Sequence, residues 1–284
     1  MGKPKIVVFG ASSYIGGSLC DYLEKNNFEI TQSSTADCDF LNAESVKNFF
    51  GSIPEMRYSI VFLSTINQHE ANSVVGFEKN IKIMSNFIKN IDLKKTSNII
   101  YFSSVKVYGN SPELPITETI KTNPSDWYSI AKFNCEWMLR YIYCEKIPVT
   151  ILRIPGIYGA APREQSVVGN FIKNIFQHQK VTIFGTGLAK RDYVFLGDLV
   201  QIVENLLMSR SSKSVQTLNI ATGKAHSILE ILEYIRNTLA INFDVEYSYE
   251  DKNNFDLCFD NSKLSSLLPS FHFKNLKDGI SSYL

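Results

Sequence analysis

The first half of the chain alternates between short β-branched runs and segments of helical periodicity, and this alternation constrains the fold more than any other feature. Continuous apolar runs predict strands at residues 5–9, 28–31, 59–64, 98–104 and 148–154. Apolar residues at helical spacing between them, beginning with Ile15, Leu19 and Leu23, predict helices from about residue 15 and at 43–50, 77–91 and 127–145. Strands of this kind belong to a parallel sheet covered by helices on both faces, so we predict an α/β, doubly wound fold.

The pattern changes after residue 155, where loops containing Gly and Pro and shorter mixed elements replace the regular alternation. We predict that this part is a smaller C-terminal region that shapes a substrate cleft.

Composition excludes several classes of function. The net charge of +1 gives no electrostatic attraction to nucleic acid or to an anionic membrane. No 18-residue apolar segment is present, and we expect no signal peptide, because the first apolar run has only five residues. The five cysteines have no metal-binding or disulfide spacing, which fits a reducing compartment, and the four histidines share no ligand spacing. We therefore expect a cytoplasmic protein without a metal site.

A glycine-containing turn joins the first predicted strand to the first helix. In "VVFGASSYIGG", Gly10 ends the strand and Gly16 begins the helix, with Ser13 at the middle position of the pattern. Backbone amides and a helix N-terminus in this context can bind a pyrophosphate. The alternative is an ordinary tight turn.

Two further features are weak when each is taken by itself. Ser104 ends a predicted strand, where ligands bind in open α/β sheets, but serines also simply terminate strands. Tyr128 and Lys132 are four residues apart on one helical face, a spacing that also arises by chance. If the pair is catalytic, the ammonium should lower the pKa of the phenol and bring proton transfer within reach of neutral pH.

Taken together, these segments resemble the extended short-chain dehydrogenase/reductase family, in its epimerase/dehydratase branch acting on nucleotide sugars. The resemblance covers nearly the whole chain: "GASSYIG", "SSVKVYG" and "YSIAK" are followed in order by "LRIPGIYG", "IFGTGLAKRDYVFLGDLV", "LNIATGK" and "FDNSKLSSLLP". It implies a Rossmann-type NAD(P)-binding domain at 1–158, with a contribution from about 191–225. The substrate-binding region would be 159–190 and 226–284.

The resemblance also implies the site residues. Catalysis would use Ser104, Tyr128 and Lys132, with Lys132 also holding the nicotinamide ribose. The cofactor would be bound by Gly10, Ser12, Ser13, Tyr14, Ile15, Gly16, Ser33, Ser34, Asp39, Phe40, Ser64, Thr65, Tyr128, Lys132 and Pro155. The substrate would be bound by Ser104, Phe184, Arg191 and Asp256, with Arg191 on the diphosphate. The helices at 77–91 and 127–145 would pair with a second subunit in a homodimer.

The chain departs from the family pattern at several positions. Gly156 stands where the family often has Asn, and Asn253 where a second diphosphate arginine is often found. Val105 and Lys106 replace the Asp and Glu that follow the strand-end residue in 4,6-dehydratases, so we expect no dehydratase activity.

The cofactor preference depends on the end of the second strand. Residues 31–34 include no carboxylate to repel a 2′-phosphate and offer three hydroxyls, so NADPH is slightly favoured over NAD. The opposing observations are that no Lys or Arg is present there and that Asp37 could fold back to the ribose, while Asp39 is assigned to the adenine.

The favoured function is reduction of a 4-keto-6-deoxy sugar nucleotide. One alternative is a nucleotide-sugar 4-epimerase with retained NAD. Another is a catalytically idle family member acting as a scaffold or regulator, against which the intact Ser104, Tyr128 and Lys132 argue.

Overall fold

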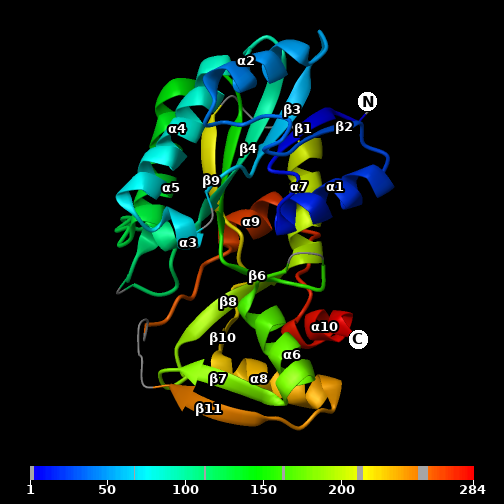
Figure 1. The fold of residues 1–284 in the computed structure, drawn as a ribbon, viewed down its shortest axis with the longest axis vertical. Coiled ribbons are helices and arrows are strands. Elements are labelled where there is room, and N and C mark those ends of the chain that lie inside the picture. The colour runs from blue at the N-terminus through cyan, green and yellow to red at the C-terminus, as the bar shows by residue number, and fades with distance from the viewer. Residues whose placement is uncertain (1–2, 67, 112, 162–163, 210–213, 249–254) are drawn as a thin grey trace. The chain divides into compact units, whose positions relative to one another are not determined.

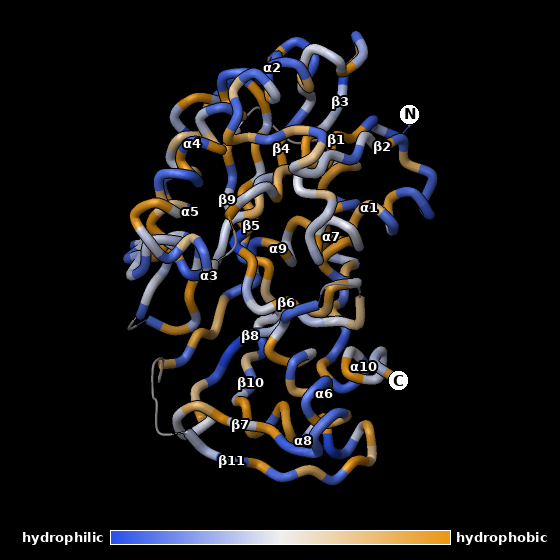
Figure 2. Tube along the Cα trace, in the orientation of Figure 1, coloured by the Kyte–Doolittle hydropathy of each residue, from blue (hydrophilic) through white to orange (hydrophobic). Residues whose placement is uncertain are grey.

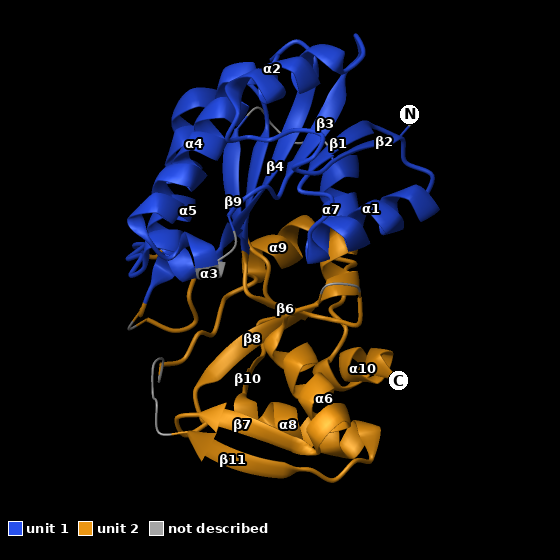
Figure 3. Ribbon diagram, in the orientation of Figure 1, with its two compact units in different colours: residues 1–109, 121–153, 203–218 blue, residues 110–120, 154–202, 219–284 orange. Residues whose placement is uncertain are grey.

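The computed structural model describes residues 3–66, 68–111, 113–161, 164–209, 214–248 and 255–284. The chain forms two compact units, shown in different colours in Figure 3. Unit 1 comprises 1–109, 121–153 and 203–218, and unit 2 comprises 110–120, 154–202 and 219–284. The two units are defined by packing alone. Which parts of the chain bind the cofactor and which bind the substrate therefore stays a prediction.

Unit 1 is built on a six-stranded sheet in the order β2-β1-β3-β4-β5-β9. Its strands are β1 (Lys5–Phe9), β2 (Ile30–Ser33), β3 (Tyr58–Phe62), β4 (Thr96–Ser104), β5 (Val149–Ile154) and β9 (Val215–Asn219). β1 pairs in parallel with both β2 and β3, and β3 pairs in parallel with β4. The chain thus winds outward from β1 to β2, then crosses back and continues on the other side of β1. This order confirms the predicted doubly wound parallel sheet.

The second strand begins two residues later than predicted, because Phe28 lies in the turn that follows the preceding helix. The amide of Phe28 donates to the carbonyl of Leu23 at 3.0 Å, and Asn27 takes a left-handed conformation with φ of 56°. Residues 26–29 therefore turn the chain, and Phe28 is buried beneath the helix end.

Helices cover both faces of the sheet. They are α1 (Tyr14–Lys25), α2 (Ala43–Ser52), α3 (Gln68–Ala71), α4 (Val74–Asn90), α5 (Trp127–Tyr143) and α7 (Leu196–Met208). α2, α4 and α5 lie on one side, while α1 and the part of α7 in unit 1 lie on the other, where Tyr22 donates to Glu204 at 2.6 Å (Figure 1). Figure 2 shows hydrophilic and hydrophobic segments alternating along α4 and α5, as expected of helices with one buried face.

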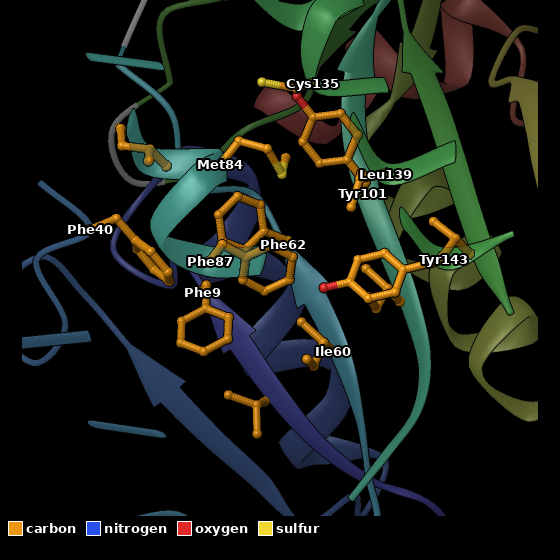
Figure 4. Packing of buried hydrophobic residues seen from close by; sticks show 14 of the residues in the cluster. Phe9, Phe40, Ile60, Phe62, Met84, Phe87, Tyr101, Cys135, Leu139 and Tyr143 are labelled. Atoms are coloured by element: carbon orange, nitrogen blue, oxygen red, sulfur yellow. The ribbon is translucent and has the colours of Figure 1, made fainter. Parts of the chain in front are cut away.

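The core of unit 1 is rich in phenylalanine. The rings of Phe62 and Phe87 have centroids 4.0 Å apart, and Phe9 packs beside them (Figure 4). Cys135, Leu139 and Tyr143 on α5 belong to the same cluster. This packing fixes α4 and α5 on the sheet and so fixes the residues that they carry.

Unit 2 contains two small sheets and its own apolar core. One sheet has the order β10-β8-β6, and the other pairs β11 in parallel with β7. Their bounds are β6 (Gly156–Tyr158), β7 (Lys180–Phe184), β8 (Lys190–Phe195), β10 (Ala225–Ser227) and β11 (Asp244–Ser248). The helices are α6 (Val167–His178), α8 (Ile228–Leu239), α9 (Ser262–Leu267) and α10 (Leu276–Ile280).

Across the described ranges, no helix combines the length and apolarity needed to span a lipid bilayer.

Candidate functional site

The turn between β1 and α1 is closed so tightly that two of its positions require glycine. Gly10 has a φ of +88°, and a Cβ on Gly16 would lie 2.1 Å from the carbonyl oxygen of Gly10. Ser13 caps α1, because its Oγ accepts from the amide of Gly16 at 3.0 Å and donates to the carbonyl of Gly10 at 2.8 Å. Any side chain on Gly16 would push the helix away from the turn. The close approach of helix N-terminus and turn is the geometry that suits a dinucleotide pyrophosphate.

The end of β2 lies against this turn and carries a carboxylate. The carbonyl of Ser33 accepts from the amides of Gly10 and Ala11 at 3.0 and 3.1 Å. The exposed Asp37 accepts from the amide and the hydroxyl of Ser34 at 2.9 and 2.7 Å, and these hydrogen bonds lower the pKa of its carboxyl. Residues 31–34 themselves carry no carboxylate, but Asp37 folds back onto Ser34, which is the opposing possibility that the sequence left open.

The loops that follow β2 and β3 are held by two buried asparagines of α4 that sequence reasoning did not identify. Asn80 accepts from the hydroxyl of Thr65 at 2.8 Å and from the amide of Ile66 at 2.9 Å. Asn86 donates to the carbonyl of Phe40 at 2.7 Å. Both asparagines interrupt the buried face of an amphipathic helix, and a polar residue at a core-facing position was the available signal.

The remaining cofactor candidates of unit 1 lie at the carboxyl ends of its parallel strands. Ser64 follows β3, and its amide is the nearest atom to a Cβ built on Gly10, at 3.0 Å. Asp39 is half-buried, and its carboxylate accepts from the amide of Leu41 at 2.9 Å. Ser12 is exposed, and Tyr14 and Ile15 are half-buried at the start of α1.

Ser104, Tyr128 and Lys132 come together where β4 ends beside α5. Ser104 is the last residue of β4, and Tyr128 is the second residue of α5. The hydroxyl of Ser104 is near enough to the phenol of Tyr128 to lower its pKa. The Nζ of Lys132 lies 5.8 Å from the centre of the Tyr128 ring and donates to the carbonyl of Phe102 at 2.9 Å. One end of one strand and one helical face therefore carry all three groups.

The electrostatics of this group differ from the sequence expectation. The pKa of Tyr128 is raised to about 12, chiefly by burial and also by the charge of Asp126, while the nearby Ser104 acts in the opposite direction. Burial lowers the pKa of Lys132 to about 8. The predicted lowering of the phenol pKa by Lys132 is not found, because the ammonium points to a backbone carbonyl and both groups are desolvated.

A buried ion pair lies directly behind these residues. Glu136 follows Lys132 by one helical turn. Its carboxylate accepts two hydrogen bonds from the guanidinium of Arg153 on β5, at 3.1 and 2.7 Å, and both side chains are almost fully buried. Ser103 donates to Glu136 at 2.5 Å. Burial by itself lowers the pKa of Arg153, but the Glu136 carboxylate more than reverses this effect. The pair and Ser103 join β4, β5 and α5. The available sequence signal was one charged residue at a buried position of an otherwise apolar element, Glu136 in the helix and Arg153 in the strand.

The substrate candidates other than Ser104 belong to unit 2. Phe184 ends β7 and is 67% exposed. Arg191 donates to the carbonyl of Lys190 at 2.8 Å and to that of Phe255, and Asp256 accepts from the amide of Lys190 at 2.7 Å. Arg191 and Asp256 thus meet at one edge of β8. Asn253 lies outside the described residues.

Residues 155 and 156, also in unit 2, show why one departure from the family pattern occurs. A Cβ on Gly156 would lie 2.8 Å from the ring of Tyr193, so this position leaves no room for an asparagine unless that ring moves. Pro155 precedes it and is half-buried. Within the parts of the chain that the structure describes, no three His, Cys, Asp or Glu side chains form a group that could hold a metal ion.

Sequence comparison identifies the family. The profile described as "NAD dependent epimerase/dehydratase family" matches residues 6–221, about three quarters of the chain. The chain belongs to the NAD-dependent epimerase/dehydratase family.

Other members of the epimerase/dehydratase family match over most of this chain. A "Putative UDP-glucose 4-epimerase" of Methanocaldococcus jannaschii is 26% identical over an alignment of 263 residues that covers 85% of each chain. The structure of UDP-glucose 4-epimerase from Bifidobacterium longum in complex with NAD+ and UDP has a TM-score of 0.85 at 16% identity, and 98% of this chain and 96% of that one are covered. The structure of RMD from Pseudomonas aeruginosa complexed with NADPH has a TM-score of 0.83 at 18% identity, with 99% and 96% covered. These two structures share the fold of this chain, and they bind different nicotinamide cofactors.

Proposed function

We propose that this protein is an NAD(P)-dependent enzyme that interconverts an alcohol and a ketone on a nucleotide-sugar ring. The observation that carries this proposal is the meeting of Ser104, Tyr128 and Lys132 at the carboxyl end of β4. The tight turn at Gly10 and Gly16 fits the pyrophosphate of a dinucleotide at the carboxyl end of the neighbouring strands.

Each residue has a distinct role in this chemistry. A bound nicotinamide would supply or accept the hydride at the sugar carbon. Ser104 would hydrogen-bond the sugar oxygen, and Tyr128 would give its proton to that oxygen as the ketone becomes an alcohol, or take it in the reverse direction. Lys132 would hold a cofactor hydroxyl and place positive charge beside the phenol as it loses its proton. Because the pKa of Tyr128 is raised, the phenol is protonated at neutral pH and carries the proton that the reductive direction requires.

Two reactions use this site equally well. The reaction expected from the sequence is reduction of a 4-keto-6-deoxy sugar nucleotide. The second candidate is 4-epimerisation, in which the same hydride leaves and returns, and the Asp37 carboxylate at the end of β2 favours it. A carboxylate there accepts the 2′-hydroxyl of NAD and repels the phosphate of NADP, and an epimerase retains NAD.

The deciding experiment is turnover on matched substrates. UDP-, dTDP-, GDP- and CDP-sugars and their 4-keto forms would be incubated with purified protein, and products separated by stereochemistry at C4. Net oxidation of added NADPH or NADH with a 4-keto sugar identifies the reductase, and interconversion of C4 epimers without net cofactor turnover identifies the epimerase. Release of a 4-keto-6-deoxy product from an ordinary hexose nucleotide would contradict the exclusion of dehydratase chemistry, which rests on Val105 and Lys106.

Asp37→Asn is expected to weaken the discrimination between NADH and NADPH. The wild-type protein should bind NADH more tightly, and loss of the negative charge should reduce this preference by roughly tenfold, because the variant no longer repels a 2′-phosphate. Dissociation constants from quenching of protein fluorescence measure the effect. Asp21→Asn, an equally exposed position on α1, is the control and should leave the preference unchanged. A wild-type protein that prefers NADPH would show that Asp37 does not reach the ribose.

Arg191→Ala is expected to raise KM for the sugar nucleotide much more than it lowers kcat. A diphosphate is remote from the reacting carbon and is bound similarly in the ground and transition states. Loss of a charge-assisted contact costs about 1.5–3 kcal/mol, which is a rise in KM of roughly tenfold or more. Steady-state kinetics check this result.

Arg236→Ala is the matched control for that experiment. Like Arg191, Arg236 lies over a phenylalanine ring and donates to a carbonyl, but it does so at α8. KM should not change in this variant. An unchanged KM in Arg191→Ala would remove Arg191 from the diphosphate site.

A further inference from the structure

Lys106 and Asp126 form an ion pair at the point where β4 and α5 present their reactive residues. Lys106 lies in the short 3-10 helix Val105–Tyr108 that follows β4, and its amide donates to the hydroxyl of Ser104 at 3.2 Å. Its Nζ is 3.5 Å from a carboxylate oxygen of Asp126. Asp126 caps α5 only two residues before Tyr128.

The cap explains why a negative charge stands so near the phenol. One carboxylate oxygen of Asp126 accepts from the amide of Ser129 at 2.7 Å, and the hydroxyl oxygen of Ser129 accepts from the amide of Asp126 at 3.1 Å. This capping box fixes the first turn of α5 and with it the position of Tyr128. An anion is stabilising at a helix N-terminus, but it opposes ionisation of a phenol in the same turn.

Several charged or titratable groups face Tyr128 from the elements packed around it. Lys132 approaches from α5, Tyr101 and Ser104 from β4 and Asp126 from the cap, while Lys106 is linked to this group through its ion pair with Asp126. Burial raises the pKa of Asp126, and hydrogen bonds from Ser129 together with the charge of Lys106 reverse this. Asp126 is therefore an anion that raises the pKa of Tyr128, and Lys106 places a cation on the same carboxylate.

We propose that Lys106 is a positioning residue for proton transfer, which compensates the charge of the Asp126 cap so that Tyr128 can ionise during the reaction. The inference rests on the proposed role of Tyr128 as the proton-transfer group. It gives a chemical role to the residue that stands where dehydratases of this family have a glutamate.

Four proteins test the pair as a charge cycle. Asp126→Asn keeps a good capping side chain but leaves Lys106 as a lone cation, so Tyr128 should ionise more readily. Lys106→Gln leaves Asp126 as a lone anion, so Tyr128 should ionise less readily. The double variant Lys106→Gln/Asp126→Asn has no charge at either position and should return close to the wild-type behaviour.

Ionisation of Tyr128 is measured directly by ultraviolet difference spectroscopy after a rapid jump to about pH 10, with Tyr128→Phe as the reference protein. Below the pKa, a shift of about half a pH unit, as expected for a partly exposed pair, changes the phenolate fraction roughly threefold. We expect a threefold rise in Asp126→Asn and a threefold fall in Lys106→Gln. The pH profile of kcat should shift in the same two directions.

Lys5→Gln serves as the control because it breaks an ion pair with Glu29 on the same unit, and it should leave the phenolate fraction unchanged. Equal phenolate fractions in all four proteins of the cycle, or a shift of the same sign in both single variants, would overturn the inference. The spectroscopic result does not require turnover. If Tyr128→Phe keeps full activity, the proposed function fails even where the ionisation cycle holds, so the two failures are distinguishable.

Discussion

Tyr128→Phe is expected to lower turnover by about 10²- to 10⁴-fold, the usual contribution of general acid–base catalysis. The change removes only the phenol oxygen, which lies near Ser104, and leaves the ring in place on α5. Cofactor affinity and the free energy of unfolding should therefore stay close to the wild-type values. Single-turnover kinetics with saturating cofactor isolate the chemical step.

Tyr141→Phe is the matched control, because it makes the same change on the same helix at a side chain that is 89% exposed. It should keep full activity. Near-normal turnover in Tyr128→Phe would defeat the assignment of the proton-transfer group and would favour the idle scaffold or regulator among the alternatives.

Arg153→Met is expected to destabilise the protein by about 3–5 kcal/mol, because it leaves the Glu136 carboxylate buried without its cation. Removal of both charges, that of Arg153 and that of Glu136, should lower the free energy of unfolding much less. In Arg153→Met/Glu136→Gln neither member of the pair is charged, and the glutamine oxygen can still accept from Ser103. The double variant should therefore recover most of the lost free energy. Equilibrium unfolding in denaturant measures both values.

The exposed Lys5–Glu29 pair supplies the comparison for this experiment. Its side chains are 37% and 66% exposed, and Glu29→Gln should cost less than about 1 kcal/mol. A similarly small loss in Arg153→Met would mean that water reaches Glu136 once the guanidinium is gone.

The regular part of the fold could be predicted because the residue types within each segment indicate by themselves whether the segment is buried. The runs at 5–9 and 98–104 are β-branched and apolar for the simple reason that strands of a sheet covered on both faces are buried. Gly10 and Gly16 were informative because the turn excludes a Cβ at each. Phe28 misled the prediction of β2, since an apolar residue beneath a helix end looks the same in sequence as the start of a strand.

The contacts of the candidate site were less accessible from sequence. Asp37 reaches Ser34 only because residues 34–37 fold back on themselves, which the sequence left open as one of two possibilities. The raised pKa of Tyr128 follows from burial and from Asp126, so it depends on packing that a spacing of four residues does not encode. Asn80 and Asn86 act on loops that are distant in the sequence, and a single chain gives no indication of such partners.

The two asparagines of α4 bear on how the specificity of this protein could be redesigned. The loops after β2 and β3 are the natural targets for exchange with those of a relative, yet each takes its shape from an amide side chain on a separate helix. A transplanted loop would arrive without its anchor, and the host asparagine would be left buried opposite the wrong backbone. Loop and helix therefore form one exchangeable cassette, and grafts that carry residues 34–66 should also carry 74–90.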